Sequence, residues 1–126
     1  MQEIIKKLKL KDIGIVINAP TALKEEFVKL HFKTELNKKI KNSNTLVFIN
    51  NNGEYLDFLN NNLIYIETDS VLWFAYPKGT SKVKTDINRD TIRVTGQEFG
   101  IATVTAISIN DTWSALRFRP IDKVGK

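Results

Sequence analysis

The sequence predicts an α/β fold: a three-layer sandwich with a mostly parallel sheet that ends in an antiparallel hairpin. Apolar residues alternate along the chain between helical spacing and short continuous runs, which is typical of helices and strands in turn. The last two runs, 101–109 and 112–118, are separated only by Asn110 and Asp111, so only an antiparallel hairpin can join them. The length suits one hydrophobic core, and we expect a single domain over residues 1–126.

The first third of the chain predicts two helices and two strands in alternation. Residues 2–9 place apolar side chains on one helical face, and residues 12–17 form a compact apolar run that is typical of a buried strand. A second helix begins near Thr21, a residue that can cap it. A short strand over 31–36 follows. The buried face of the second helix is expected to consist of Leu23, Phe27 and Leu30.

The middle of the chain predicts the centre of the sheet. Residues 45–50 form a continuous apolar strand, and "VLWFAY" over residues 71–76 is the most apolar run. Continuous apolarity indicates a parallel strand that is covered on both faces, which places Trp73 in the core. The helix between these strands is expected to bury Leu56, Leu59 and Leu63.

A helix over residues 86–99 should follow, with Asp86 as its cap and Gly100 as its end. Its inward residues are expected to be Ile87, Val94 and Phe99.

The polar loop 77–90 is the expected ligand site. It follows the central strand and precedes a helix, and ligands of open α/β sheets bind beyond the carboxyl ends of the parallel strands. Lysines supply positive charge, and Ser and Thr supply hydroxyl donors. The alternative is a solvated loop in which Asp86 caps the helix and Arg89 pairs with Asp90. The candidate ligand-binding residues are Lys78, Thr80, Ser81, Lys82, Lys84, Thr85, Arg89 and Trp113.

The hairpin contributes the remaining candidate. Trp113 begins its second strand and can either hydrogen bond to the loop through its indole N–H or stack on a base or sugar ring. Alternation predicts two faces for this strand: Trp113, Ala115, Arg117 and Arg119 on one, and Ser114, Leu116 and Phe118 on the other. We therefore expect Arg117 and Arg119 to be surface charges.

The order of elements resembles a reduced class I methyltransferase, which is a Rossmann-like fold. In that superfamily the turn after the first strand is rich in glycine, because the backbone must approach the cofactor closely. Here residues 17–23 contain no glycine and include Pro20, which lacks an amide hydrogen. Gly79 also has no partner glycines for a phosphate loop. The sequence therefore predicts no S-adenosylmethionine site and no cofactor.

Two segments carry a more specific resemblance. "WFAYPKGTSKVKTDINRD" and "INDTWSALRFRP" are similar to signature segments of a family of short bacterial proteins with a domain of unknown function. In that family a strand ending in Tyr/Trp-Pro-Lys leads into a Ser- and Thr-bearing loop, and an Asp-Thr-Trp-Ser-Ala-Leu hairpin follows. The match covers residues 71–120. The resemblance implies a reduced methyltransferase-like fold with no assigned activity.

Composition excludes several kinds of chemistry. The chain has one histidine, His31, and no cysteine, which excludes thiol nucleophiles and the usual zinc sites. Asp86 and Asp90 share a predicted helical face, but the nearby cations favour ion pairing over Mg²⁺, so no metal is expected.

The N-terminus lacks a signal sequence and no apolar run is long enough to span a membrane, so we expect a cytoplasmic protein. The net charge is +5, with basic ends and an acidic middle, and the lysines of the first third are expected on solvated helix faces, which disfavours nucleic acid as a partner.

The leading interpretation is a non-enzymatic binding module that holds a small phosphorylated or carboxylate ligand, or an acidic partner, through loop 77–90. One alternative is a small enzyme that acts on an anionic substrate at the same loop. The other is an oligomeric or partner-docking scaffold that uses the hairpin and the terminal helix.

Overall fold

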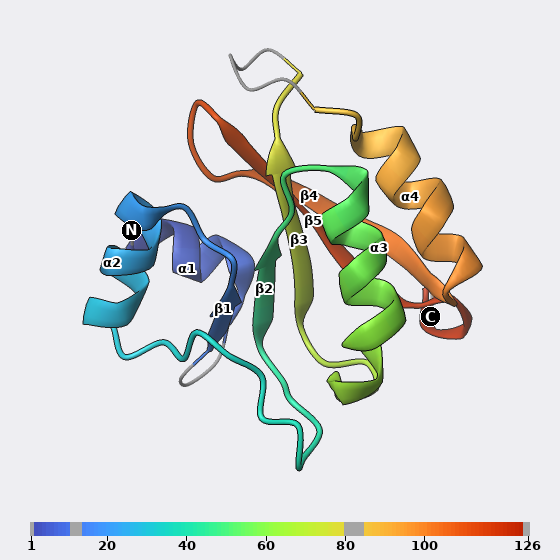
Figure 1. The fold of residues 1–126 in the computed structure, drawn as a ribbon, viewed down its shortest axis with the longest axis horizontal. Coiled ribbons are helices and arrows are strands. Elements are labelled where there is room, and N and C mark those ends of the chain that lie inside the picture. Colours follow the sequence, from blue (N-terminus) through green and yellow to red (C-terminus); the bar gives the residue numbers. More distant parts are fainter. Residues whose placement is uncertain (1, 11–13, 80–84, 125–126) are drawn as a thin grey trace.

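The computed structural model describes residues 2–10, 14–79 and 85–124. Within these ranges the chain forms a mixed α/β fold with four α-helices and a five-stranded open sheet (Figure 1). The elements, in chain order, are α1 (Gln2–Leu8), β1 (Ile15–Ile17), α2 (Thr21–Lys29), β2 (Thr45–Phe48), α3 (Asn52–Asn61), the 3₁₀ helix η1 (Leu63–Tyr65), β3 (Leu72–Pro77), α4 (Arg89–Glu98), β4 (Ile101–Ser108), β5 (Trp113–Pro120) and the 3₁₀ helix η2 (Ile121–Lys123).

The strands lie in the order β1-β2-β3-β5-β4. Strands β1, β2 and β3 pair in parallel, whereas β5 is antiparallel to both β3 and β4. The predicted hairpin of β4 and β5 is confirmed. Strand β5 lies between β3 and β4, so β4 forms one edge of the sheet. The carboxyl ends of the three parallel strands therefore meet at one edge of the sheet.

The buried side chains form two clusters that use alternate residues of the same strands. Val47 of β2 packs with α3 residues such as Tyr55 and Phe58, whereas Leu46 and Phe48 pack with α1 and α2. The side alternation that we expected for β5 is confirmed: Trp113 and Ala115 belong to one cluster, and Leu116 and Phe118 belong to the other.

Trp73 anchors α1 to the sheet. Its side chain is 1% exposed, as its place in the apolar run predicts, and its indole N–H donates to the carbonyl of Leu8 at 2.7 Å. A buried indole needs such a partner, because an unpaired polar group away from water is costly.

The helix after β3 begins later than the sequence predicts. Its N-cap is Asn88, whose side chain accepts from the Thr91 amide, and Asp86 lies outside the helix. The prediction of Asp86 as the cap was wrong because Asp86 Oδ1 instead accepts a hydrogen bond from the Asn52 amide at 2.7 Å.

Ile87 and Phe99 pack in the core as predicted, but the third residue that was expected to point inward does not. Val94 is 48% exposed, and the helix buries Ile92 and Gly96. A Cβ atom at Gly96 would lie 2.8 Å from Phe118 Cε2, so the glycine allows α4 to approach β5 closely.

Two further expectations need correction. The segment 31–36 forms no strand; it contributes one parallel bridge, between Ile15 and Lys33, at the outer edge of β1.

Helix α3 buries Tyr55, Phe58 and Leu59, so the predicted face was rotated from the observed one. Aromatic residues at these positions fill more volume, and they set which face packs on the sheet. Part of the predicted strand 12–17 lies outside the described residues, and β1 begins at Ile15.

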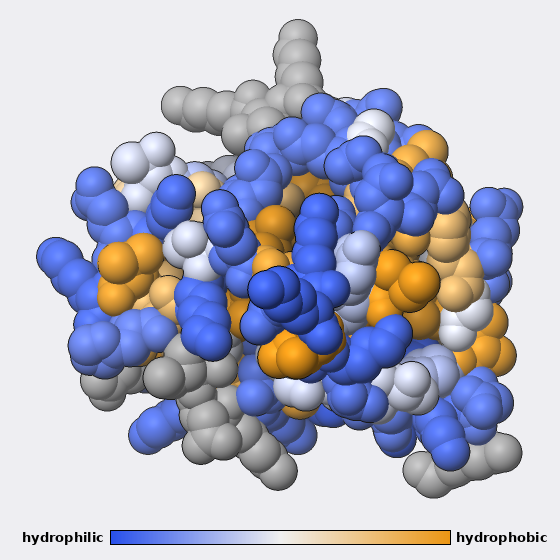
Figure 2. All heavy atoms as spheres, turned by 60° about the horizontal axis from the view of Figure 1, so that its bottom comes forward, coloured by the Kyte–Doolittle hydropathy of each residue, from blue (hydrophilic) through white to orange (hydrophobic). Residues whose placement is uncertain are grey.

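The surface is mixed in character. On the end of the molecule shown in Figure 2, hydrophobic residues reach the surface in separate patches between hydrophilic ones. None of the described helices has both the length and the apolarity that a bilayer crossing requires.

Candidate functional site

The crossover helices change sides between β1 and β2. After β1 the chain enters α2, whose Phe27 packs in the cluster that contains Trp73, whereas after β2 it enters α3, which packs in the cluster on the other face of the sheet. In open α/β sheets, a change of side at the carboxyl ends of adjacent strands opens a crevice where ligands bind. We call this place the switch point.

Glu54 lies at the switch point and is fixed by three hydrogen bonds to one carboxylate oxygen. Oε1 accepts from Asn18 Nδ2 at 2.9 Å, from the Asn50 amide at 2.8 Å and from Asn50 Nδ2 at 3.0 Å. The second oxygen, Oε2, accepts no hydrogen bond from any residue that the structure describes. The carboxylate is therefore held in place with one oxygen left for another partner.

Local sequence explains this geometry. Asn51 caps α3 by accepting from the Glu54 amide at 2.9 Å, which places Glu54 at the third helical position and turns its side chain back over the end of β2. Asn18 follows β1 with φ +60°, a conformation that asparagine tolerates better than most residues. Its Nδ2 also donates to the Phe48 carbonyl at 3.1 Å, so it bridges the ends of β1 and β2.

A groove of about 260 Å³ opens beside this carboxylate. Its apolar wall includes Ile17, Val47 and Phe58, and its polar wall includes Glu54 and Asp57, which are three residues apart on α3. Asp57 accepts a hydrogen bond from Asn61 at 2.8 Å.

A second hollow of about 450 Å³ adjoins the groove and shares Ile17, Phe58 and Asn62 with it. Its charged lining residues are Glu35 and Lys38. Together the two hollows have three carboxylates and one ammonium group, which favours a neutral or cationic ligand over an anion.

The structure describes only part of the predicted site in loop 77–90, so that site stays a prediction. Thr80, Ser81, Lys82 and Lys84 lie outside the described residues. Lys78 Nζ donates to Ser108 Oγ on β4 at 2.6 Å, and Thr85 Oγ1 donates to the Asn50 carbonyl. Arg89 is an exposed residue in the first turn of α4. Thr85 thus supports the segment that positions Glu54, whereas Lys78 points to the hairpin.

Trp113 is part of the core. It is 7% exposed, and its ring meets the Phe48 ring edge-on with centroids 5.0 Å apart, in the cluster that includes α1 and α2. Stacking on a base or sugar ring, one of the two alternatives for this indole, is therefore not available in this conformation.

Arg117 is partly exposed, and its Nε is shielded from solvent without a hydrogen-bond partner among the described groups. Arg119 is partly exposed and pairs with Asp69.

Two tyrosines near α4 are perturbed by burial. Burial raises the pKa of Tyr76, while the charge of Arg89 and a hydrogen bond with Ser114 oppose this rise. Burial also raises the pKa of Tyr55, whose hydroxyl donates to the Ile92 carbonyl at 2.8 Å. Both hydroxyls are protonated at neutral pH and serve packing.

The described part of the chain has no cluster of three or more His, Asp or Glu side chains that could hold a metal ion. Asp86 and Asp90, which we considered as a Mg²⁺ pair, have separate partners. Asp86 accepts from the Asn52 amide, and Asp90 lies 3.9 Å from Arg93 on the solvent-exposed side of α4.

Comparison with known proteins bears on the fold. No protein-family model matches the sequence, and no curated protein matches it. Among solved structures, the chain is similar to one described as a pericyclic reaction enzyme, to LepI in complex with SAM, and to a LepI variant in complex with SAH and a substrate analogue. Each match has a TM-score of 0.51 at 9% identity and covers 94% of this chain but 39% of the other.

This likeness shows a shared fold and leaves the methyltransferase-like arrangement as a prediction. The chain spans well under half the length of these proteins, so their ligands and reactions are not transferred to it. The resemblance to a family of short bacterial proteins stays a prediction, because no family model matches.

The leading functional interpretation requires correction. We predicted a non-enzymatic binding module, but a solved structure that shares the fold is described as a pericyclic reaction enzyme, which counts against that interpretation. Anion binding by loop 77–90 gains no support from the described residues.

Sequence reasoning missed Glu54. The available signal was that polar residues directly follow two apolar strands, at Asn18 and at Asn50, with a carboxylate shortly after the second.

Proposed function

We propose that the protein is a small enzyme whose active site is the groove at the switch point, with Glu54 as its catalytic carboxylate. We further propose that residues 1–126 form one reduced, three-layer methyltransferase-like domain. The observation that carries the functional proposal is the unequal use of the two Glu54 oxygens: three N–H groups fix Oε1, and Oε2 has no partner within the described chain.

A carboxylate held in this way suits two tasks. It can orient a hydroxyl or amino group of a substrate by accepting its hydrogen bond, and it can accept the proton of that group as a general base. Three donors keep the side chain in place, so little reorganisation is needed when a substrate arrives. The apolar wall formed by Ile17, Val47 and Phe58 would bury the less polar part of the substrate.

The charge of the groove defines the substrate class. Glu54 and Asp57 line it together, and the next hollow adds Glu35 and Lys38. We therefore propose a neutral or cationic small molecule that bears hydroxyl or amino groups. This proposal replaces the anionic substrate that the lysine-rich loop had suggested.

The turn after β1 does not fit an S-adenosyl cofactor placed against the backbone. Asn18 has the positive φ that glycine often supplies, but its side chain crosses to Phe48 and Glu54 and fills the approach. Pro20 offers no amide hydrogen at the start of α2, where such a ligand would need donors. We therefore assign Glu54 no role in binding that cofactor and propose catalysis by protein side chains.

The test is a thermal-shift screen with probes that are matched in shape but differ in charge. Adenosine is compared with adenosine monophosphate, and glucosamine with glucosamine 6-phosphate; S-adenosylmethionine is included. We expect an uncharged or cationic member to raise the melting temperature and its phosphorylated partner to do so less. Stabilising compounds are then incubated with the protein and followed by mass spectrometry for turnover.

Glu54→Gln is the decisive variant because it keeps the side-chain size while removing the charge and the basic oxygen. We expect turnover to fall at least about a hundredfold, which is the lower range for loss of a general base. Asp90→Asn is the matched control, since Asp90 is an exposed carboxylate on α4. Stabilisation by phosphorylated probes alone, or turnover that Glu54→Gln leaves intact, would contradict the proposal.

A further inference from the structure

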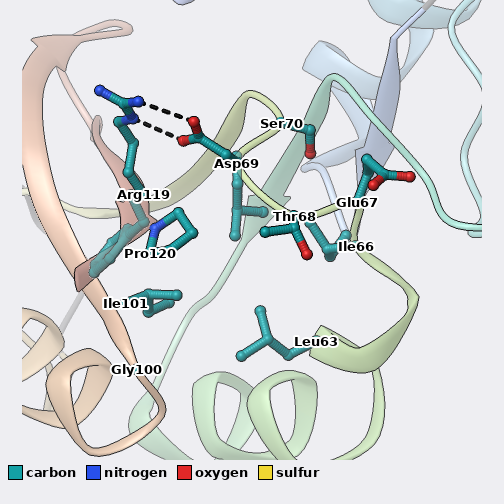
Figure 3. Close-up of a pocket in the computed structure, with 12 residues that line it drawn as sticks. Leu63, Ile66, Glu67, Thr68, Asp69, Ser70, Gly100, Ile101, Arg119 and Pro120 are labelled. Atoms are coloured by element: carbon teal, nitrogen blue, oxygen red, sulfur yellow. Dashed lines mark hydrogen bonds and ion pairs between the residues drawn. The ribbon is translucent and has the colours of Figure 1, made fainter. Parts of the chain in front are cut away.

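A separate pocket, distinct from the two hollows at the switch point, lies at the opposite end of the sheet. It has a volume of about 260 Å³ and sits where η1, the segment before β3 and the end of β5 meet. In Figure 3, Leu63 and Ile101 approach from two sides, and Asp69 turns away from them toward Arg119. Ile66, Leu72 and Phe118 add apolar lining. The pocket is thus mainly apolar with a polar margin on one side.

The charged groups at this margin neutralise one another. Asp69 accepts from Arg119 Nε at 2.7 Å and from Arg119 Nη2 at 2.9 Å, one bond to each carboxylate oxygen. The Arg119 guanidinium lowers the pKa of Asp69, so the pair stays ionised and internally matched at neutral pH. Glu67 is exposed to solvent at the rim. A ligand of this pocket therefore meets no unmatched charge in its interior.

One polar atom of the pocket is buried without a partner. Ser70 lines the pocket, and its Oγ is shielded from solvent yet makes no hydrogen bond within the described chain. Buried hydroxyls are nearly always paired, and each exception calls for an explanation such as a water or a ligand. Asp69, directly before it, has φ +59°, a conformation that is uncommon outside glycine and often marks functional segments.

We propose that this pocket binds a neutral, ring-sized, mainly apolar molecule that carries one hydroxyl or carbonyl group, and that this group hydrogen bonds to Ser70. The apolar lining favours an apolar ligand body. The Asp69–Arg119 ion pair leaves no unmatched charge, so the ligand should be uncharged. The Ser70 hydroxyl without a partner calls for one polar group on the ligand. The volume is sufficient, since an apolar cavity of about 150 Å³ accommodates benzene. The site is independent of the Glu54 groove.

Phenol and benzene are the matched probes, because they differ only in the hydroxyl group. Each is titrated into ¹⁵N-labelled protein while amide resonances are followed by NMR. We expect saturable shifts at residues around the pocket, among them Ile101 and Ser70, with phenol about three- to tenfold tighter than benzene, as one neutral hydrogen bond implies. Ser70→Ala should abolish this difference and leave benzene binding in place.

Leu63→Trp tests the location by filling the pocket from its partly exposed side. We expect it to abolish saturable binding of both probes. Leu56→Trp is the matched control on α3, outside the pocket lining. Equal affinity of phenol and benzene for the wild-type protein, unsaturable shifts, or binding that survives in Leu63→Trp would overturn the proposal. Glu54→Gln should change neither titration, which separates this result from the proposed enzymatic function.

Discussion

The two ends of the sheet each hold a carboxylate in a fixed position, but they use it differently. At the amino end of β3, Arg119 occupies both oxygens of Asp69. At the carboxyl ends of β1 and β2, three donors share one oxygen of Glu54 and leave the other without a partner in the described chain. The Asp69 carboxylate joins the segment before β3 to the end of β5. The Glu54 carboxylate is fixed but has one oxygen that could bind a ligand. Full pairing accounts for Asp69 as a structural residue, whereas the incomplete pairing of Glu54 is the basis of the catalytic role that we propose for it.

The largest effect should come from a residue that both ends depend on. Trp73→Ala removes a side chain that is 1% exposed and its hydrogen bond to Leu8, so we expect a loss of about 3–5 kcal/mol in unfolding free energy. Urea unfolding followed by fluorescence of Trp113 and by circular dichroism measures it. A loss below 1 kcal/mol would mean that the central strand does not couple the two ends.

A second substitution should separate the ends. Gly96→Ala places a Cβ atom 2.8 Å from Phe118 Cε2, and Phe118 lines only the amino-end pocket. We expect about 1–3 kcal/mol of destabilisation from this crowding and amide shifts around Ile101 but not around Asn18.

Gly79→Ala is the control for Gly96→Ala, because no residue that the structure describes lies within 4 Å of the added atom. Equal shifts at both ends of the sheet would show that the two regions are not independent.

The third prediction concerns the carboxyl end alone. Asn51→Ala removes the cap that sets the first turn of α3, which should cost about 1 kcal/mol. Asn88→Ala removes the equivalent cap of α4 and should cost a similar amount. Only Asn51→Ala should also weaken ligand binding in the Glu54 groove, as thermal shift would report. Loss of binding in both variants would indicate general destabilisation.

The smallest effect should appear in acid. Arg119 lowers the pKa of Asp69 in the folded protein, so the contribution of Asp69 is present above the unfolded-state pKa of about 4 and disappears as pH falls through the lower folded-state value. Asp69→Asn, which also tolerates a positive φ, should be less stable than the wild type at pH 7 and approach it near pH 2. Urea unfolding at both pH values measures this. An unchanged difference would contradict the pairing.

Much of the sheet could be predicted from sequence. The runs at 45–50 and 71–76 are continuous and apolar because both faces of those strands are covered, and the short Asn110–Asp111 link permits only a hairpin. The start of α4 was misplaced because Asp86 and Asn88 are both good capping residues, and a contact from the distant Asn52 amide decides between them.

The site was harder to predict than the sheet. Lysines drew attention to loop 77–90, whereas Asn18 and Glu54 are 36 positions apart, and only the pairing of β1 with β2 brings them together. Trp113 was a candidate for contact with the loop because its strand position could be predicted, whereas the covering of that face by α1 and α2 could not. Local pattern thus predicts elements, and long-range contacts determine which polar groups meet.

The most direct test compares the two carboxylates by NMR of ¹³C-labelled protein. The side-chain carboxyl resonances of Glu54 and Asp69 are followed while a hydroxyl- or amino-bearing ligand that stabilises the protein is added. We predict that the Glu54 signal shifts with saturation and that the Asp69 signal stays in place. A Glu54 signal that does not move while the ligand binds would contradict the central claim.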